Sequence, residues 1–190
     1  PVAMAEILNS DEVHIDGFIG PSHVSIVIGS DAYKKVSDKY NKPIVIAGFE
    51  PLDVLQSILF LVELINKDQV SIINQYSRAV STDGNLKAQK MIAGVLELRQ
   101  EFSWRGLGSI PASGLKLRKE YADYDAEMIF SLPQFTSDDV KACECPQILR
   151  GLKDPRDCKL FGLACTPEHP MGACMVSSEG ACAASYQYSI

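Results

Sequence analysis

The first 142 residues of this 190-residue chain contain no cysteine, although the whole sequence holds six. Every cysteine lies in the last quarter of the chain, at Cys143, Cys145, Cys158, Cys165, Cys174 and Cys182. The sequence between them is rich in Gly, Pro and short polar residues, so we expect loops rather than long helices there. Thiols that loops bring together bind an iron–sulfur cluster, bind zinc or form disulfides.

Long apolar runs and runs of one charge are also missing. The longest apolar run, residues 58–62, is far shorter than the roughly 20 residues of a membrane span, so no membrane association is expected. A net charge of −6 and the lack of a Lys/Arg run argue against a nucleic-acid partner.

Targeting signals are absent as well. No charged region followed by an apolar stretch marks a secretory signal. We therefore expect a cytoplasmic protein, in which thiols stay reduced and disulfides are disfavoured. The chain opens with Pro-Val-Ala-Met instead of an initiator Met, as a fragment or a processed product would.

The common nucleotide-binding and hydrolase motifs are not found. Gly106, Gly108 and Gly114 do not have the spacing and context of a dinucleotide-binding or phosphate-binding loop. A Gly-x-Ser-x-Gly elbow is absent too, and no single thiol stands out as a nucleophile.

Strand-like and helix-like stretches alternate through residues 1–132. Strands are expected at 13–19, 43–48, 70–73 and 105–110, and helices from about 23, at 51–67, 86–99 and 120–130. This order predicts an α/β domain with three layers and a mainly parallel sheet over residues 1–132. A loop-rich, Cys-rich segment over 133–190 follows it.

Side-chain patterns support the expected helices. Ser22 and Asn85 are candidate N-caps. Apolar residues recur at helical spacing in 51–67, at Leu52, Leu55, Leu59, Val62 and Ile65. In 86–99 the residues expected to face inward are Ala88, Ile92, Val95 and Leu96.

Three loops that follow strands carry the candidate catalytic residues. In parallel sheets, ligands bind beyond the carboxyl ends of the strands, where this chain places His23, Glu50, Asp53 and Arg78. Structural roles compete with catalytic ones. His23 can bond a backbone carbonyl, the two carboxylates can complement a helix dipole, and Arg78 can be a pairing residue.

The cysteine spacing leaves the bound group open. Structural zinc sites usually show two closely spaced ligand pairs, whereas this chain has only Cys143-x-Cys145. The other gaps are wide and irregular, which suits a cluster approached from several loops. An iron–sulfur cluster, zinc, and redox dithiols or disulfides all remain candidates at this point.

Several stretches together resemble the HypD family of hydrogenase maturation proteins, and the resemblance covers the whole chain. They are Pro21-Ser22-His23-Val24-Ser25, Gly48-Phe49-Glu50-Pro51-Leu52-Asp53, Asn74-Gln75-Tyr76-Ser77-Arg78, Trp104-Arg105-Gly106-Leu107-Gly108 and Cys174-Met175-Val176-Ser177-Ser178-Glu179-Gly180-Ala181-Cys182-Ala183-Ala184. Ser22 departs from the glycine usual in the family. The chain also resembles only the C-terminal half, and the Cys-Gly-Thr-His-Glu and Gly-Pro-Gly-Cys-Pro-Val-Cys motifs of the N-terminal half are missing.

The resemblance implies a factor in [NiFe] hydrogenase maturation. Family members, with a HypC-type chaperone, are the scaffold on which the Fe(CN)₂CO unit is built, and a HypE-type partner delivers cyanide. The C-terminal cysteines are implied to hold a [4Fe–4S] cluster that feeds electrons through a dithiol relay. The transient iron site would lie mostly in the absent N-terminal half, which is a further candidate partner.

The same resemblance suggests roles for individual residues. Four of the six cysteines would ligate the cluster, with Cys158 and Cys165 as first choices. His23, Glu50 and Asp53 would line a cleft, moving protons or orienting the cyanide donor. Catalysis would then need the missing half and the partners. The alternatives are a zinc-stabilised, non-redox protein-binding module and a stand-alone thiol-dependent enzyme.

Overall fold

In a computed structural model, the chain is described over residues 1–104, 106–130 and 141–188. It forms two compact units. The sheet unit comprises Pro1–Ala5 and Ile15–Glu97, and the cysteine unit comprises Glu6–His14 and Leu98–Ile190. The boundary expected between 132 and 133 lies outside the described residues.

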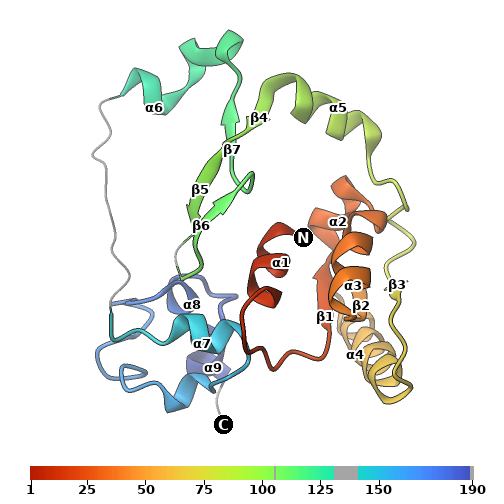
Figure 1. The fold of residues 1–190 in the computed structure, drawn as a ribbon, viewed down its shortest axis with the longest axis vertical. Coiled ribbons are helices and arrows are strands. Elements are labelled where there is room, and N and C mark those ends of the chain that lie inside the picture. The colour runs from red at the N-terminus through yellow and green to blue at the C-terminus, as the bar shows by residue number, and fades with distance from the viewer. Residues whose placement is uncertain (105, 131–140, 189–190) are drawn as a thin grey trace. The chain divides into compact units, whose positions relative to one another are not determined.

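A parallel sheet forms the centre of the sheet unit (Figure 1). Its strands are β1 (Phe18–Pro21), β2 (Ile44–Ala47) and β3 (Ile72–Asn74), in the order β1-β2-β3. β2 lies in the middle, where Ile44 pairs with Phe18 on one side and with Ile72 on the other. All four residues of β2 are buried, as a continuous apolar run predicts for the central strand of a parallel sheet.

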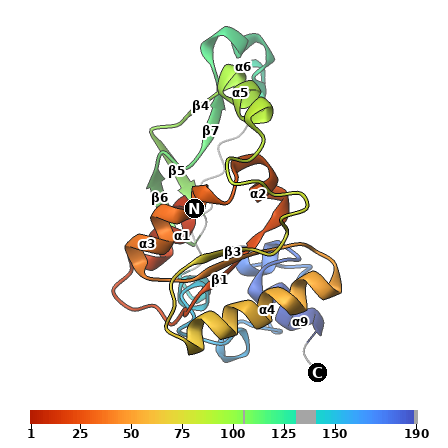
Figure 2. The same ribbon diagram turned by 90° about the vertical axis from the view of Figure 1, so that its right-hand side faces the viewer.

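The helices in this part of the chain are α1 (Val2–Leu8), α2 (Ser22–Ile28), η1 (Asp31–Tyr33), α3 (Lys34–Tyr40), α4 (Pro51–Asn66) and α5 (Leu86–Val95). Of these, α2 and α4 contact the strands. α4 begins at Pro51, which favours a first helical position because its ring presets the backbone angle φ, and it runs along the sheet (Figure 2). The prediction of an α/β fold with a mainly parallel sheet is confirmed.

Two local predictions are wrong. Ser22 does not cap α2, because Pro21 is the N-cap and Ser22 is already a buried helical residue. β1 begins at Phe18 rather than at residue 13, since the N–H of His14 donates to the carbonyl of Arg150 in the cysteine unit instead of joining the sheet.

Helix α4 buries a different face from the one its leucines suggest. It buries Asp53, Ser57 and Leu64, while Leu52 and Leu55 are 80% and 63% exposed. α5 has no buried residue, so the predicted inward face is wrong there too. Within the described parts of the chain, no helix has the length and apolar character needed to cross a lipid bilayer.

Short elements and loops build the cysteine unit. After β4 (Leu96–Leu98) they are β5 (Glu101–Trp104), β6 (Gly108–Pro111), β7 (Leu115–Leu117), η2 (Lys119–Tyr124), α6 (Ala126–Ile129), α7 (Cys145–Leu149), η3 (Pro155–Asp157), α8 (Ala173–Val176) and α9 (Ala181–Tyr188). β5 and β6 pair antiparallel. The strand expected at 105–110 is β6, and the helix expected at 120–130 is η2 followed by α6. The predicted loop-rich C-terminal segment is confirmed.

Candidate functional site

The six thiols come from different turns of the cysteine unit. Cys145 opens α7, Cys158 follows η3, and Cys165 forms an isolated bridge with Phe161. Cys174 lies in α8 and Cys182 in α9. These cysteines therefore enter from different short helices and turns, as the wide sequence gaps predict.

All six cysteines line one pocket. Five are buried, Cys143 is half-buried, and none of the six is in a disulfide. The remaining lining residues are apolar or glycine: Ile148, Leu160, Phe161, Gly172 and Met175. The Sγ atoms of Cys145 and Cys174 lie 2.6 Å apart. The sequence prediction that loops bring the thiols together therefore agrees with this geometry.

Backbone features fix the pocket wall. A side chain at Gly172 would collide with the Sγ of Cys143, and one at Gly180 would collide with the carbonyl of Cys174. The backbone N–H of Met171 donates to the Sγ of Cys165 at 3.3 Å. This contact holds the sulfur of Cys165 in place at the wall of the pocket.

Burial keeps several thiols protonated while the pocket holds no metal. It raises the pKa of Cys143, and it raises that of Cys182 to about 11, helped by the neighbouring thiols. The pKa of Cys174 is raised first by its hydrogen bond with Cys145 and then by burial. Since metals bind thiolates, loading this pocket requires the release of protons.

The donors suit a soft metal group. Thiolate sulfur is the ligand preferred by iron–sulfur clusters and is also a common zinc ligand. In the described ranges, no three His, Cys, Asp or Glu side chains stand in the arrangement of a site for one metal ion. Six sulfurs exceed the four that a [4Fe–4S] cluster requires, so the chemistry of the pocket fits such a cluster.

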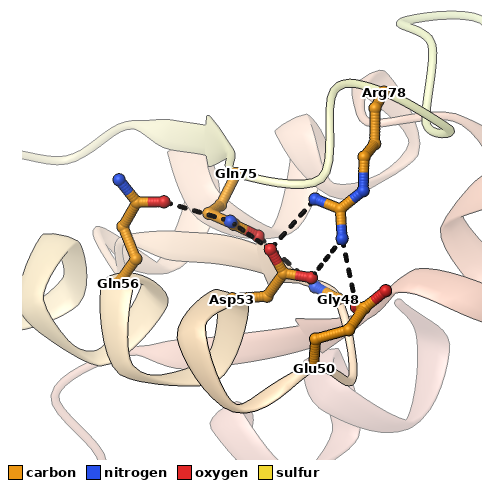
Figure 3. Close-up of polar contacts among 6 residues, drawn as sticks. All are labelled: Gly48, Glu50, Asp53, Gln56, Gln75 and Arg78. Atoms are coloured by element: carbon orange, nitrogen blue, oxygen red, sulfur yellow. Dashed lines mark hydrogen bonds and ion pairs between the residues drawn. The ribbon is translucent and has the colours of Figure 1, made fainter.

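A second polar site lies at the carboxyl ends of β2 and β3 (Figure 3). The guanidinium of Arg78 donates to both carboxylate oxygens of Asp53, from Nη1 at 3.0 Å and from Nη2 at 2.5 Å. The same Nη2 lies 3.1 Å from a carboxylate oxygen of Glu50. One arginine from the loop after β3 thus joins both candidate carboxylates at the start of α4.

Amide side chains complete this network. The Nε2 of Gln75 donates to Asp53 at 2.8 Å and to Gln56 at 3.1 Å. The backbone N–H of Gly48 lies 3.5 Å from the Oε1 of Gln75. A side chain at Gly48 would collide with Asp53, so this position requires glycine for close approach.

The two carboxylates differ in exposure and in their hydrogen bonds. The hydrogen bonds from Arg78 hold the pKa of Asp53 far below its usual range, and Asp53 raises the pKa of Arg78 in return. The side chain of Asp53 is 9% exposed, whereas that of Glu50 is 58% exposed. Asp53 therefore stays ionised and orients Arg78, while Glu50 remains accessible to a ligand.

His23 lies in the first turn of α2, beside the loop after β2. Its ring stacks on Phe49, with 5.5 Å between the ring centroids and 22° between the planes. The structure thus brings Glu50 and Asp53 together on Arg78 and brings His23 to the residue before Glu50. Catalytic roles for these three residues stay predictions.

The sequence interpretation missed some polar residues near both sites. Gln56 joins the strand-end network, and its position one helical turn after Asp53 is the available signal. Glu144, between two cysteines, pairs with Lys153. No spacing rule predicts that second pair, because it joins two loops whose paths depend on the fold.

The fold and the site define an α/β protein with a clustered-thiol unit. A family model described as the hydrogenase formation hypA family, HypD, matches residues 1–189. The chain therefore belongs to the HypD family, and the resemblance found in the sequence is confirmed.

Relatives of known name agree with this assignment. The chain is 56% identical to hydrogenase maturation factor HypD2 of Bradyrhizobium diazoefficiens and 56% identical to HypD of Cupriavidus necator, in each case over 99% of this chain and 51% of the relative. It is 45% identical to HypD of Escherichia coli K12, over 97% of this chain and 50% of the relative. The chain thus spans about half the length of these curated relatives.

Proposed function

We propose that this chain is the part of a hydrogenase maturation factor that holds a [4Fe–4S] cluster and supplies electrons for cofactor assembly. The cargo is the iron of the Fe(CN)₂CO unit of [NiFe] hydrogenase. The proposal rests first on the pocket that all six cysteines line and second on membership of the HypD family.

The cysteine unit is suited to electron supply. When bound, a [4Fe–4S] cluster accepts and donates single electrons. Cys158 and Cys165 are our first choices as ligands, with two more from the remaining four thiols. The apolar residues around the thiols limit the access of water, and hydrophobic surroundings influence the reduction potential.

The strand-end network is suited to an anionic ligand. Arg78 presents a guanidinium that Asp53 orients and that Glu50 contacts at the surface. An incoming anion can replace Glu50 on Arg78 without moving Asp53. We assign Asp53 to positioning, and Glu50 and His23 to orienting the cyanide donor or moving a proton.

The proposed partners follow from the chemistry that this chain lacks. Four of the six thiols are assigned to the cluster and the other two line the same pocket, so we assign the soft ligands of the assembled iron to a partner. We propose the other half of the HypD length, a HypC-type chaperone and a HypE-type cyanide donor as these partners, in the cytoplasm.

The cluster is tested by anaerobic reconstitution with iron and sulfide. We expect about four iron atoms per chain and broad absorption near 400 nm, the composition and colour of a [4Fe–4S] group. Cys158→Ser should remove most of both signals. Tight binding of zinc without uptake of iron would overturn the proposal and favour a zinc-stabilised protein-binding module.

The strand-end site is tested in a HypD protein of full length. Glu50→Gln and His23→Ala, made at the aligned positions, should abolish hydrogenase maturation while the iron content stays unchanged. Lys67→Met, which removes an exposed cation at the other end of α4, is the matched control and should mature hydrogenase normally. Normal hydrogenase maturation with both variants would show that Glu50 and His23 have structural roles only.

A further inference from the structure

One ion pair of the cysteine unit joins two of the loops that carry the thiols. The Nζ of Lys153 lies 2.5 Å from the Oε1 of Glu144. Their side chains are only 24% and 23% exposed, which sets this pair apart from the exposed pair of Arg156 and Asp154, at 62% and 52%. The pair is therefore held in one geometry and partly shielded from solvent.

Glu144 is placed close to the thiols by its sequence position, because it is the single residue between Cys143 and Cys145. Its Oε1 accepts a hydrogen bond from the Nζ of Lys153, whereas its Oε2 is buried and has no hydrogen-bond partner in the described part of the chain. The ion pair therefore sets one negative and one positive charge beside two of the proposed cluster ligands.

An ionised carboxylate beside a ligating sulfur disfavours added negative charge. A cluster gains one negative charge when it is reduced, so Glu144 alone would make reduction harder. Lys153 cancels this charge at hydrogen-bond distance.

We propose that Lys153 is a tuning residue that keeps the cluster reducible by neutralising Glu144. This inference rests on the proposed [4Fe–4S] cluster. Lys153 acts through Glu144 and not by ligation, so it is a positioning residue and not a catalytic one.

The expected effect is large enough to measure. A unit charge removed about 12 Å from a redox centre, at an effective dielectric constant of about 20, changes an equilibrium constant by about tenfold. For a one-electron couple, tenfold is ~59 mV. Glu144 neighbours two of the cysteines directly, so we expect Lys153→Met to lower the midpoint potential by about this amount.

The sign of the shift separates tuning from a purely structural role. Glu144→Gln leaves Lys153 unpaired and should raise the potential, opposite to Lys153→Met. The double variant, Glu144→Gln with Lys153→Met, removes both charges and should restore the unsubstituted value. Lys153→Arg keeps the charge and should change the potential little.

The experiment is a potentiometric titration of the reconstituted chain, followed by electron paramagnetic resonance of the reduced cluster. Arg156→Met, in the exposed pair of the same segment, is the matched control and should shift the potential far less, because solvent and salt screen it. If Lys153→Met binds no cluster, the midpoint potentials of Glu144→Gln and of the double variant still test the inference.

The midpoint potentials of the variants support or overturn the inference as follows. Opposite shifts in the two single variants, cancelling in the double variant, support the inference. Equal potentials, or shifts of the same sign, overturn it while leaving the cluster proposal intact. Absence of iron from the unsubstituted chain overturns the proposed function, and this inference with it.

Discussion

The sheet unit and the cysteine unit are stabilised by different kinds of side chain. In the sheet unit, Ile44, Val45 and Ile46 are fully buried in the central strand, and Tyr33 and Val80 join that core. In the cysteine unit, five of the eight residues of the main buried cluster are cysteines. Hydrocarbon burial alone can hold the first core together, whereas cysteine side chains make up most of the second core.

This difference means that the two units should depend differently on bound metal. The sheet unit needs no ligand for its apolar core, because aliphatic side chains carry no donor or acceptor that a ligand would have to satisfy. The cysteine unit has short helices of four to eight residues around its thiols, and helices of this length are marginal on their own. We therefore expect bound metal to stabilise only the second region.

The largest effect should come from removing thiols or metal. Cys165→Ser removes a proposed cluster ligand, whose sulfur accepts the N–H of Met171, and iron should fall from about four atoms to less than one per chain. Hydrogen exchange should then speed up in α7, α8 and α9 while β2 stays protected. Loss of protection in β2 as well would contradict the separation of the two regions.

A core deletion in the sheet should give the opposite pattern. Ile46 is fully buried, so Ile46→Ala should lower the free energy of unfolding by about 2–5 kcal/mol. Urea unfolding followed by far-UV circular dichroism measures this loss. Leu52→Ala, at an exposed position of α4, is the control and should change stability by no more than about 0.5 kcal/mol. Iron content per folded chain should be unchanged in both.

The pH dependence of the sheet unit should depend on Asp53. Arg78 lowers the pKa of Asp53 in the folded state, while the unfolded value is near 3.9. Below about pH 4 the unfolded state therefore binds more protons than the folded state, and the free energy of unfolding decreases as the pH is lowered. The contribution of Asp53 is present at neutral pH and is lost as pH falls through the folded value.

Asp53→Asn tests this sign. The variant should unfold at a lower urea concentration than the unsubstituted chain at pH 7, and the gap should be smaller at pH 3, where the unfolded chain already binds protons at Asp53. Glu50→Gln, which changes the exposed partner of Arg78, should show a much smaller gap at both values. An equal gap for Asp53→Asn at pH 7 and pH 3 would count against the ion pair.

The smallest effect concerns a helix cap. Asn85 accepts a hydrogen bond from the N–H of Ala88 at 3.0 Å, and losing an N-cap typically costs about 1 kcal/mol. Asn85→Ala should lower the free energy of unfolding by this amount, measured in urea. Ser22→Ala should not remove a cap, because Ser22 lies inside α2. A loss of about 1 kcal/mol of unfolding free energy in this variant, without a cavity, would contradict the assignment of Pro21 as the N-cap.

Much of the fold was predictable from local signals. The buried run at β2, the proline that opens α4 and the asparagine that caps α5 each act within a few residues, so the sequence alone reports them. The gathering of the thiols was predictable as well, because apolar surroundings and loops leave cysteine few other roles.

Other features depended on tertiary contacts. α4 buries Asp53, which bonds Arg78 and Gln75, and it also buries Ser57 and exposes Leu52, an orientation that the spacing of its leucines does not predict. The segment before β1 leaves the sheet because His14 bonds Arg150. The pairing of Glu144 with Lys153 depends on two loop paths, and periodicity carries no information about those.

Native mass spectrometry of the chain, purified without oxygen, tests the central claim most directly. The account predicts a species heavier than the polypeptide by four iron and four sulfide, and the loss of that species in Cys158→Ser. A polypeptide that carries one zinc ion, or whose cysteines are joined as disulfides with no inorganic sulfide bound, would contradict it.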